Sequence, residues 1–151
     1  KPKAYTMRSD RAPYKVPGDI LDDTPLLEAI RDELEKYNCI VTWNGKLFDV
    51  PFMNARLMRK GKRRIEPQFH IDAMYYAGGC SNRIGSKKLV NVQKFLGLKQ
   101  SKTELEWETW QRAAAGNKKA MNEVVTHCEA DVEVTAEAYW CLLPAIKNVH
   151  R

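Results

Sequence analysis

The sequence predicts a single α/β domain. Segments with apolar residues at helical spacing alternate with short, nearly continuous apolar segments, which are typical of strands buried on both faces of a sheet. A chain of 151 residues with 44% hydrophobic and 29% charged residues has the length and composition for one buried core. The expected order, helix, strand, helix, strand and then several helices, is that of an α/β fold.

The N-terminal part is expected to differ from the rest. Residues 1–18 should form an extended arm, because prolines and a glycine interrupt regular structure there, with a short strand at residues 4–8. The domain itself then covers residues 19–151. Its first helix should begin with Asp23 or Thr24 as the N-cap and Pro25 at the first helical position, followed by apolar residues at helical spacing.

A short apolar segment, Cys39–Trp43, predicts a buried strand that ends at Asn44-Gly45. Two interpretations of the next residues remain open. An Asn-Gly turn followed by Lys46–Val50 would make a type I′ hairpin. Alternatively, Pro51 prevents a second strand and begins a helix, which places Asp49 at the helix N-terminus, where the helix dipole favours a carboxylate.

The later elements follow from the same patterns. A loop rich in Lys and Arg precedes a second strand or strand-turn, and helical spacing dominates the C-terminal half. The expected elements are a strand over His70–Ala77, a helix around 89–96 ended by Gly97, a helix around 107–113 interrupted at Gly116-Asn117, and a helix over 118–143 ended by Pro144.

Positive charge is concentrated in the middle of the chain. The net charge is +6, but residues 46–102 contain 13 Lys or Arg against 3 Asp or Glu. Such a bias suits a polyanion, because Lys and Arg that contact phosphates release condensed counterions. A solvated helix end and loop would explain the same pattern. The basic residues concerned are Arg56, Arg59, Lys60, Lys62, Arg63 and Arg64, with Arg83, Lys87 and Lys88 further along.

His127 and Asp131 form a second candidate motif. Because they are four residues apart on an expected helix, their side chains should share one face. Metal-assisted hydrolysis uses such a pair, in which a carboxylate holds a divalent cation and an imidazole deprotonates the attacking water. A hydrogen bond on a helix surface is the simpler explanation of the pair alone.

The succession of motifs resembles a known family. It consists of Asn-Gly-x-x-Phe-Asp-x-Pro-Phe at residues 44–52, a helix ending in Leu-Gly-Leu, a Trp-containing helix, and a last helix with His127 before Asp131-Val132. This order resembles the DnaQ-like (DEDD) 3′–5′ exonucleases of the ribonuclease H-like superfamily, and among them the YprB-type predicted nucleases of bacteria and phages. Residues 44–52 also resemble the second exonuclease motif of family B DNA polymerases. The resemblance covers roughly residues 19–146.

The resemblance implies roles for individual residues. Asp49 and Asp131 would be metal-binding carboxylates for two Mg²⁺ or Mn²⁺ ions, and His127 would take the place of the general base. The substrate would be a nucleic acid, DNA in preference to RNA. Asn44 and Phe48 would contact its terminal nucleotide, and phosphates would be contacted by Lys46, Arg59, Lys87 and Lys88.

One part of the family pattern is missing from this sequence. The family carries an Asp-x-Glu pair on its first, central strand, and no apolar strand with that pair precedes Cys39. Glu104, Glu106 and Glu108 are a poor substitute. We therefore expect a ribonuclease H-like mixed sheet, flanked by helices, that lacks its N-terminal strand or strands. An upstream segment or a second chain would complete it, and because the sequence opens on Lys1 we expect a fragment or a processed chain.

The remaining expectations concern function class and location. The sequence shows neither a transmembrane stretch nor a signal peptide, and four widely spaced cysteines indicate reduced thiols in a cytoplasmic protein. The resemblance implies that the cell is a bacterial or phage-infected one. Three functions remain open: a metal-dependent 3′–5′ exonuclease, a nucleic-acid-binding module of the same fold without activity, and a structural or protein-binding domain.

Overall fold

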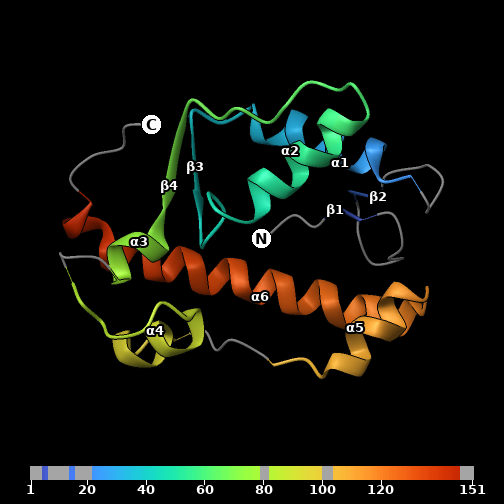
Figure 1. Cartoon of the computed structure of the whole chain (residues 1–151). Helices are drawn as coiled ribbons and strands as arrows, with labels where there is room; N and C mark the ends of the chain where they lie inside the picture. The colour runs from blue at the N-terminus through green and yellow to red at the C-terminus, as the bar shows by residue number, and fades with distance from the viewer. Residues whose placement is uncertain (1–4, 7–13, 16–21, 79–81, 100–103, 147–151) are drawn as a thin grey trace.

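A long helix and a pair of parallel strands organise the molecule (Figure 1). The computed structural model describes residues 5–6, 14–15, 22–78, 82–99 and 104–146. Within them the fold is α/β, as expected, and is compatible with a ribonuclease H-like fold that lacks strands.

The N-terminal segment contributes two very short strands. β1 (Tyr5–Thr6) and β2 (Tyr14–Lys15) pair in parallel, with Tyr5 opposite Tyr14. β1 falls within the strand expected at residues 4–8. The rest of the expected arm lies outside the described residues.

Helices α1 (Thr24–Leu34) and α2 (Asp49–Arg59) pack against each other. Pro25 occupies the first turn of α1, as expected. The N-cap residue is Asp23, whose side chain makes no capping hydrogen bond, and the carboxylate of Asp22 instead accepts hydrogen bonds from the backbone N–H and the hydroxyl of Thr24 (3.1 and 2.6 Å). Capping by a carboxylate two residues before the helix satisfies a backbone donor that has no partner within the helix.

Strands β3 (Cys39–Thr42) and β4 (Phe69–Asp72) pair in parallel, with Cys39 opposite Phe69 and Thr42 opposite Asp72. The hairpin interpretation of the Asn-Gly turn is therefore wrong, because β3 pairs with a strand far along the chain and α2 begins at Asp49. A parallel pair requires a long crossover, which α2 provides here.

The second expected strand is shorter than its apolar pattern. It ends at Asp72, and α3 (Ala73–Gly78) begins at once, so the expectation of a strand over His70–Ala77 is wrong for its second half. The Asp72 carboxylate accepts a hydrogen bond from the backbone N–H of Met74 (3.3 Å), which favours helix initiation at this point.

The C-terminal half is helical. α4 (Leu89–Leu96) ends at Gly97, and α5 (Trp107–Ala114) is followed by α6 (Lys118–Leu142) and a short 3₁₀ turn at Leu143–Ala145. These elements agree with the sequence predictions. α6 begins at Asn117, whose side chain accepts a hydrogen bond from the backbone N–H of Ala120 (3.0 Å). None of the described helices combines the length and apolar character needed to cross a membrane.

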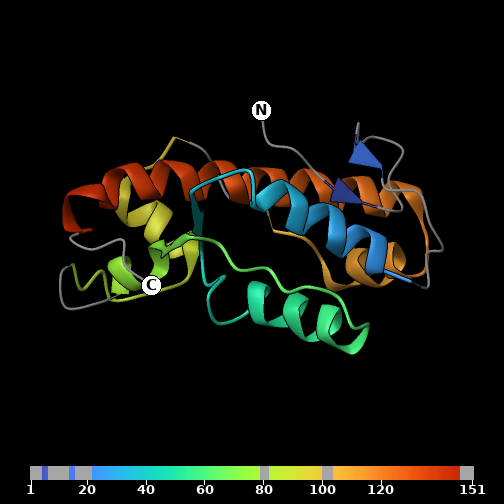
Figure 2. The same cartoon turned by 90° about the horizontal axis from the view of Figure 1, so that it is seen from above.

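Two hydrophobic clusters lie on different sides of the strand pair. One joins α3, α4 and α6, and the other joins α1, α2 and the segment after α2. α6 contacts α3, α4, α5 and β3, and the carboxyl ends of β3 and β4 point towards it (Figure 1). Seen from above, α2 and α6 lie on opposite sides of the molecule (Figure 2). The residues of the two clusters are Ala73, Ala77, Val92 and Leu142, and Leu27, Leu57 and Ile65.

A buried amide fixes the segment after α2. The Asn54 side chain donates to the carbonyl of Ile65 (3.1 Å) and accepts from its N–H (2.7 Å). Because Asn54→Ala would leave both buried backbone groups without a partner, we expect it to lower the free energy of unfolding by about 2 kcal/mol in urea denaturation. Asn82→Ala is the control, since that exposed side chain donates a hydrogen bond to the Tyr76 carbonyl at the protein surface. An equal effect of the two changes would contradict this prediction.

Candidate active site

The turn after β3 is held in place by one buried carboxylate. Asp72 is 1% exposed and lies at the carboxyl end of β4, beside the end of β3. Its Oδ1 accepts from the N–H of Asn44 (2.8 Å), and its Oδ2 accepts from the N–H of Lys46 (3.0 Å). The turn connecting β3 to α2 is therefore built on Asp72.

Two residues of the turn are suited to its backbone. Asn44 has a φ of 67°, a left-handed conformation that Asn tolerates better than most residues. At Gly45 a Cβ atom would lie 2.5 Å from the side chain of Thr42, so only glycine fits. The Asn-Gly pair therefore redirects the chain from β3 into α2.

Asp49 is the first residue of α2 and lines a cleft of about 1030 Å³. Burial raises the pKa of its carboxyl above the usual value, and the negative charge of Asp72 adds to this effect. Of the two carboxylates, that of Asp72 is buried within the turn and that of Asp49 lines the cleft.

Asp131 lies on α6 and lines the same cleft. The structure thus brings Asp49 and Asp131, which are far apart in the sequence, to one hollow beside the carboxyl ends of the strands. α/β proteins commonly place their sites at this edge of the sheet. Glu104 is a third acidic residue in the lining, whereas Glu106 and Glu108 are not among the described residues that line the cleft.

His127 shares a face of α6 with Asp131, as its spacing predicts. Its Nε2 lies 3.7 Å from Oδ2 of Asp131, and its ring meets the ring of Trp110 edge-on at 5.9 Å between centroids. With 11% of its side chain exposed, His127 packs towards α5 and is not among the described residues that line the cleft. Its role as a base stays a prediction.

The residues predicted to bind substrate lie in three places. Asn44, Lys87 and Lys88 line the cleft, where the indole N–H of Trp43 donates to the carbonyl of Lys87 (3.0 Å). Lys46 lines a separate pocket. The other two predicted residues lie on the surface of α2.

Phe48, the residue before α2, and Arg59, the last residue of α2, are both exposed. Phe48 is 63% exposed and stacks on Phe52, with centroids 6.4 Å apart and planes 12° apart. Arg59 lies exposed at the other end of the helix. Stacked, exposed rings are suited to contact with bases, and the prediction for Phe48 remains compatible with its position.

The basic segment at the end of α2 is largely neutralised by α1 and the residues before it. Lys60 and Lys62 pair with Asp22 and Glu28 (3.3 and 3.1 Å). Two further ion pairs of the same kind are Arg56 with Asp23 and Arg63 with Glu35. The ion pairs join α2 and the segment after it to α1 and the residues beside it. For these four residues, an exposed helix end and loop explains the run of positive charge without a bound polyanion.

The described carboxylates do not form a complete metal site. Carboxylate oxygens are the ligands that Mg²⁺ and Mn²⁺ prefer. Although Asp49, Glu104 and Asp131 line one cleft, no group of three or more His, Cys, Asp or Glu residues within the described part of the chain could hold a metal ion. A bound ion would need ligands beyond these.

Sequence reasoning missed the role of Asp72. The signal available in the sequence was an Asp at the end of an apolar segment, but the apolar residues after it suggested that the strand continued. The contribution of Glu104 to the cleft was also missed, because a run of alternating Glu residues is usually a solvated surface.

The titration of His70 offers a test of the local electrostatics. Burial lowers the pKa of its ring below 6.5, and the charge of Lys46 lowers it further. We expect Lys46→Gln to raise the pKa of His70, measured by NMR titration of the ring, whereas Lys88→Gln should leave it unchanged. Since the folded-state pKa is below the unfolded one, His70 stabilises the fold above pH 6.5, and this contribution is lost as the pH falls through the folded-state pKa. A Lys46→Gln shift in the opposite direction would contradict the proposed geometry.

Comparison with known proteins identifies a family whose model matches most of the chain. A family model described as RNase_H superfamily matches residues 13–142. No curated protein and no solved structure matches the chain. The matched range contains β3, α2, β4 and α6, which carry Asp49, Asp72 and Asp131.

Proposed function

The chain belongs to the RNase_H superfamily, and from this premise we propose that it is a metal-dependent nuclease that removes nucleotides from the 3′ end of a nucleic acid. Membership of the superfamily indicates nuclease action on nucleic acids. The observation that carries the proposal is that Asp49 and Asp131 line one cleft together with Lys87 and Lys88. Acidic groups suit divalent cations, and the two lysines suit the phosphates of a bound strand.

In this proposal each predicted site residue has a defined role. Asp49 and Asp131 hold Mg²⁺ or Mn²⁺, which supplies charge stabilisation for phosphodiester hydrolysis. His127, next to Asp131, is the base. Asn44 and Phe48 contact the terminal nucleotide of a strand that is DNA in preference to RNA. Phosphates are contacted by Lys46, Arg59, Lys87 and Lys88.

The remaining metal ligands would come from outside the described residues. Among the described strands, β3 pairs on one side with β4 and has no partner on its other side. Unpaired strand edges are normally covered or paired. An acidic strand from an upstream segment or a second chain, added at this edge, would be adjacent to Asp49 and would complete the site.

A second candidate function has a specific observation in its favour. The described residues lack a complete group of metal ligands, which is what a nucleic-acid-binding module without activity would show. Such a module would bind nucleic acid in a salt-sensitive manner without hydrolysing it.

The deciding experiment measures binding and cleavage together. A 5′-labelled single strand of DNA, and an RNA of the same sequence, are incubated with the chain in Mg²⁺, in Mn²⁺ and in EDTA. Once the strand that completes the site is supplied, we expect progressive shortening from the 3′ end with either metal and none in EDTA, whereas the chain alone should cleave weakly. Salt-sensitive binding without shortening would replace the proposed function by the binding module, and neither binding nor cleavage would leave a structural domain.

A further inference from the structure

A second hollow lies along α2, next to the face that packs against α1, and is not part of the cleft. It has a volume of about 470 Å³, and α2 forms one wall. Its polar lining residues are Lys46, Asn54, Arg64 and His70, and no acidic residue is among the described residues that line it. The pocket is therefore positively charged.

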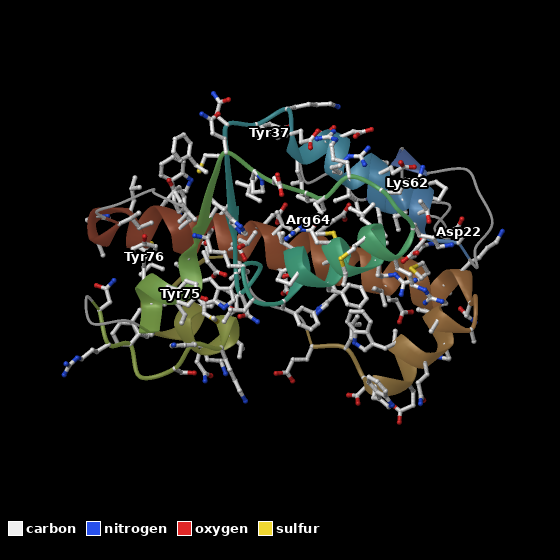
Figure 3. All side chains as sticks on the ribbon, turned by 45° about the horizontal axis from the view of Figure 1, so that its top comes forward. Asp22, Tyr37, Lys62, Arg64, Tyr75 and Tyr76 are labelled. Atoms are coloured by element: carbon white, nitrogen blue, oxygen red, sulfur yellow. The ribbon has the colours of Figure 1, made fainter. Side chains whose placement is uncertain are left out.

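The packing of the neighbouring residues directs Arg64 to this pocket. Ile65 is 2% exposed and packs in the cluster between α1 and α2, where the Asn54 amide holds its backbone. Arg63, on the other side in sequence, pairs with Glu35. In Figure 3, Arg64 lies beside α2, apart from Lys62 and Asp22 at the far end of α1.

Arg64 and Lys46 keep their charges available. Within the described part of the chain, neither has an acidic side chain within ion-pair distance, in contrast to the four neutralised cations of the same run. The backbone of Lys46 is held by Asp72, and His70 is held by Thr42, whose Oγ1 lies 2.9 Å from Nε2. Within the described residues, the pocket thus has two positively charged side chains without an acidic partner, and neighbouring backbone and side-chain groups of the pocket are held by hydrogen bonds.

We propose that this pocket binds a backbone phosphate of the nucleic acid, at a nucleotide other than the one in the cleft. Arg offers several donors in a planar array that matches phosphate oxygens, and Lys adds a second charge. The inference rests on the proposed function, because the segment from Asn44 to Pro51 contributes to both hollows: Asn44 and Asp49 line the cleft, and Lys46 and Pro51 line the pocket. A strand that crosses this segment presents phosphates to both.

The test uses the full chain in EDTA, where hydrolysis does not interfere. The binding of a 5′-fluorescein-labelled single strand is followed by fluorescence anisotropy at several salt concentrations. Arg64→Gln should weaken binding roughly tenfold and reduce the salt slope by about 0.7. The matched control is Arg63→Gln, which removes an adjacent charge that is already paired, and should leave both quantities unchanged. Thermal unfolding checks that both variants fold.

A second arm separates a backbone phosphate from a free one. Inorganic phosphate and a nucleoside 5′-monophosphate are titrated by calorimetry into the wild type and Arg64→Gln. The proposal is supported if Arg64→Gln weakens oligonucleotide binding and Arg63→Gln does not. It is overturned if Arg64→Gln weakens the binding of the small anions alone, or if the two variants weaken oligonucleotide binding equally. Cleavage that persists without an Arg64 effect overturns this inference alone. An Arg64 effect without any cleavage overturns the nuclease proposal alone.

Discussion

Replacing Asp131 with asparagine is expected to reduce cleavage of an end-labelled strand by about a thousandfold. The carboxylate lines the same cleft as Asp49, and in the proposed function it holds a divalent cation. Asparagine has the same shape but no charge, so the fold should be retained while the affinity for the cation falls. Loss of several kcal/mol of charge stabilisation in the transition state corresponds to a rate decrease of this size.

The affinity for a nucleic-acid strand provides a second measurement, which should not decrease when cleavage does. In EDTA, Asp131→Asn removes a negative charge from a cleft that also contains Lys87 and Lys88, so the affinity for a labelled strand should be unchanged or higher. Glu133→Gln is the matched control: it removes one charge from the same helix at a position that is not among the described residues lining the cleft. Equal cleavage by wild type and Asp131→Asn would exclude the proposed site.

The elements that position the candidate site were predictable where their signals are local. The turn at Asn44-Gly45 and the long helix bearing Asp131 follow from turn residues and helical spacing, whereas the start of α2 near Asp49 was one of two interpretations, the one that Pro51 favours over a hairpin. Each depends on residues within about one or two helical turns of one another, and a single sequence contains that information.

The features that could not be predicted depend on contacts between distant segments. Asp72 acquires its role only because β4 pairs in parallel with β3 and places its carboxylate under the turn. The cations after α2 are neutralised because α1 packs alongside them. For His127, the spacing to Asp131 predicts a shared face of α6, but only the packing of α5 decides that the ring meets Trp110.

Asp72→Ala is expected to be among the most destabilising single changes in the chain, lowering the free energy of unfolding by about 3 kcal/mol. The carboxylate is 1% exposed and accepts hydrogen bonds from three backbone N–H groups, those of Asn44, Lys46 and Met74. Alanine leaves all three donors without their acceptor and removes the anchor of the turn between β3 and α2. Urea denaturation with a fixed m-value measures the loss.

Asp72→Asn distinguishes the hydrogen bonds from the charge. The amide keeps one acceptor oxygen but turns a donor towards one of the backbone N–H groups, so we expect a loss of roughly 2 kcal/mol, smaller than for alanine. Because the charge of Asp72 raises the pKa of Asp49, the same variant should lower that pKa, and burial should keep it above its ordinary value. Carboxyl NMR titration of Asp49 measures the shift.

A control separates this buried carboxylate from surface ones. Asp32 is a largely exposed carboxylate whose partner, Arg31, is buried. Because Asp32→Asn keeps an acceptor oxygen for the guanidinium, it should cost about 1 kcal/mol, less than Asp72→Asn. If Asp72→Asn cost no more than Asp32→Asn and left the pKa of Asp49 unchanged, the turn could not be anchored as described. Asp49 follows this turn directly, so its position in the cleft with Asp131 depends on the anchoring by Asp72. Asp72 itself is not among the described residues that line the cleft.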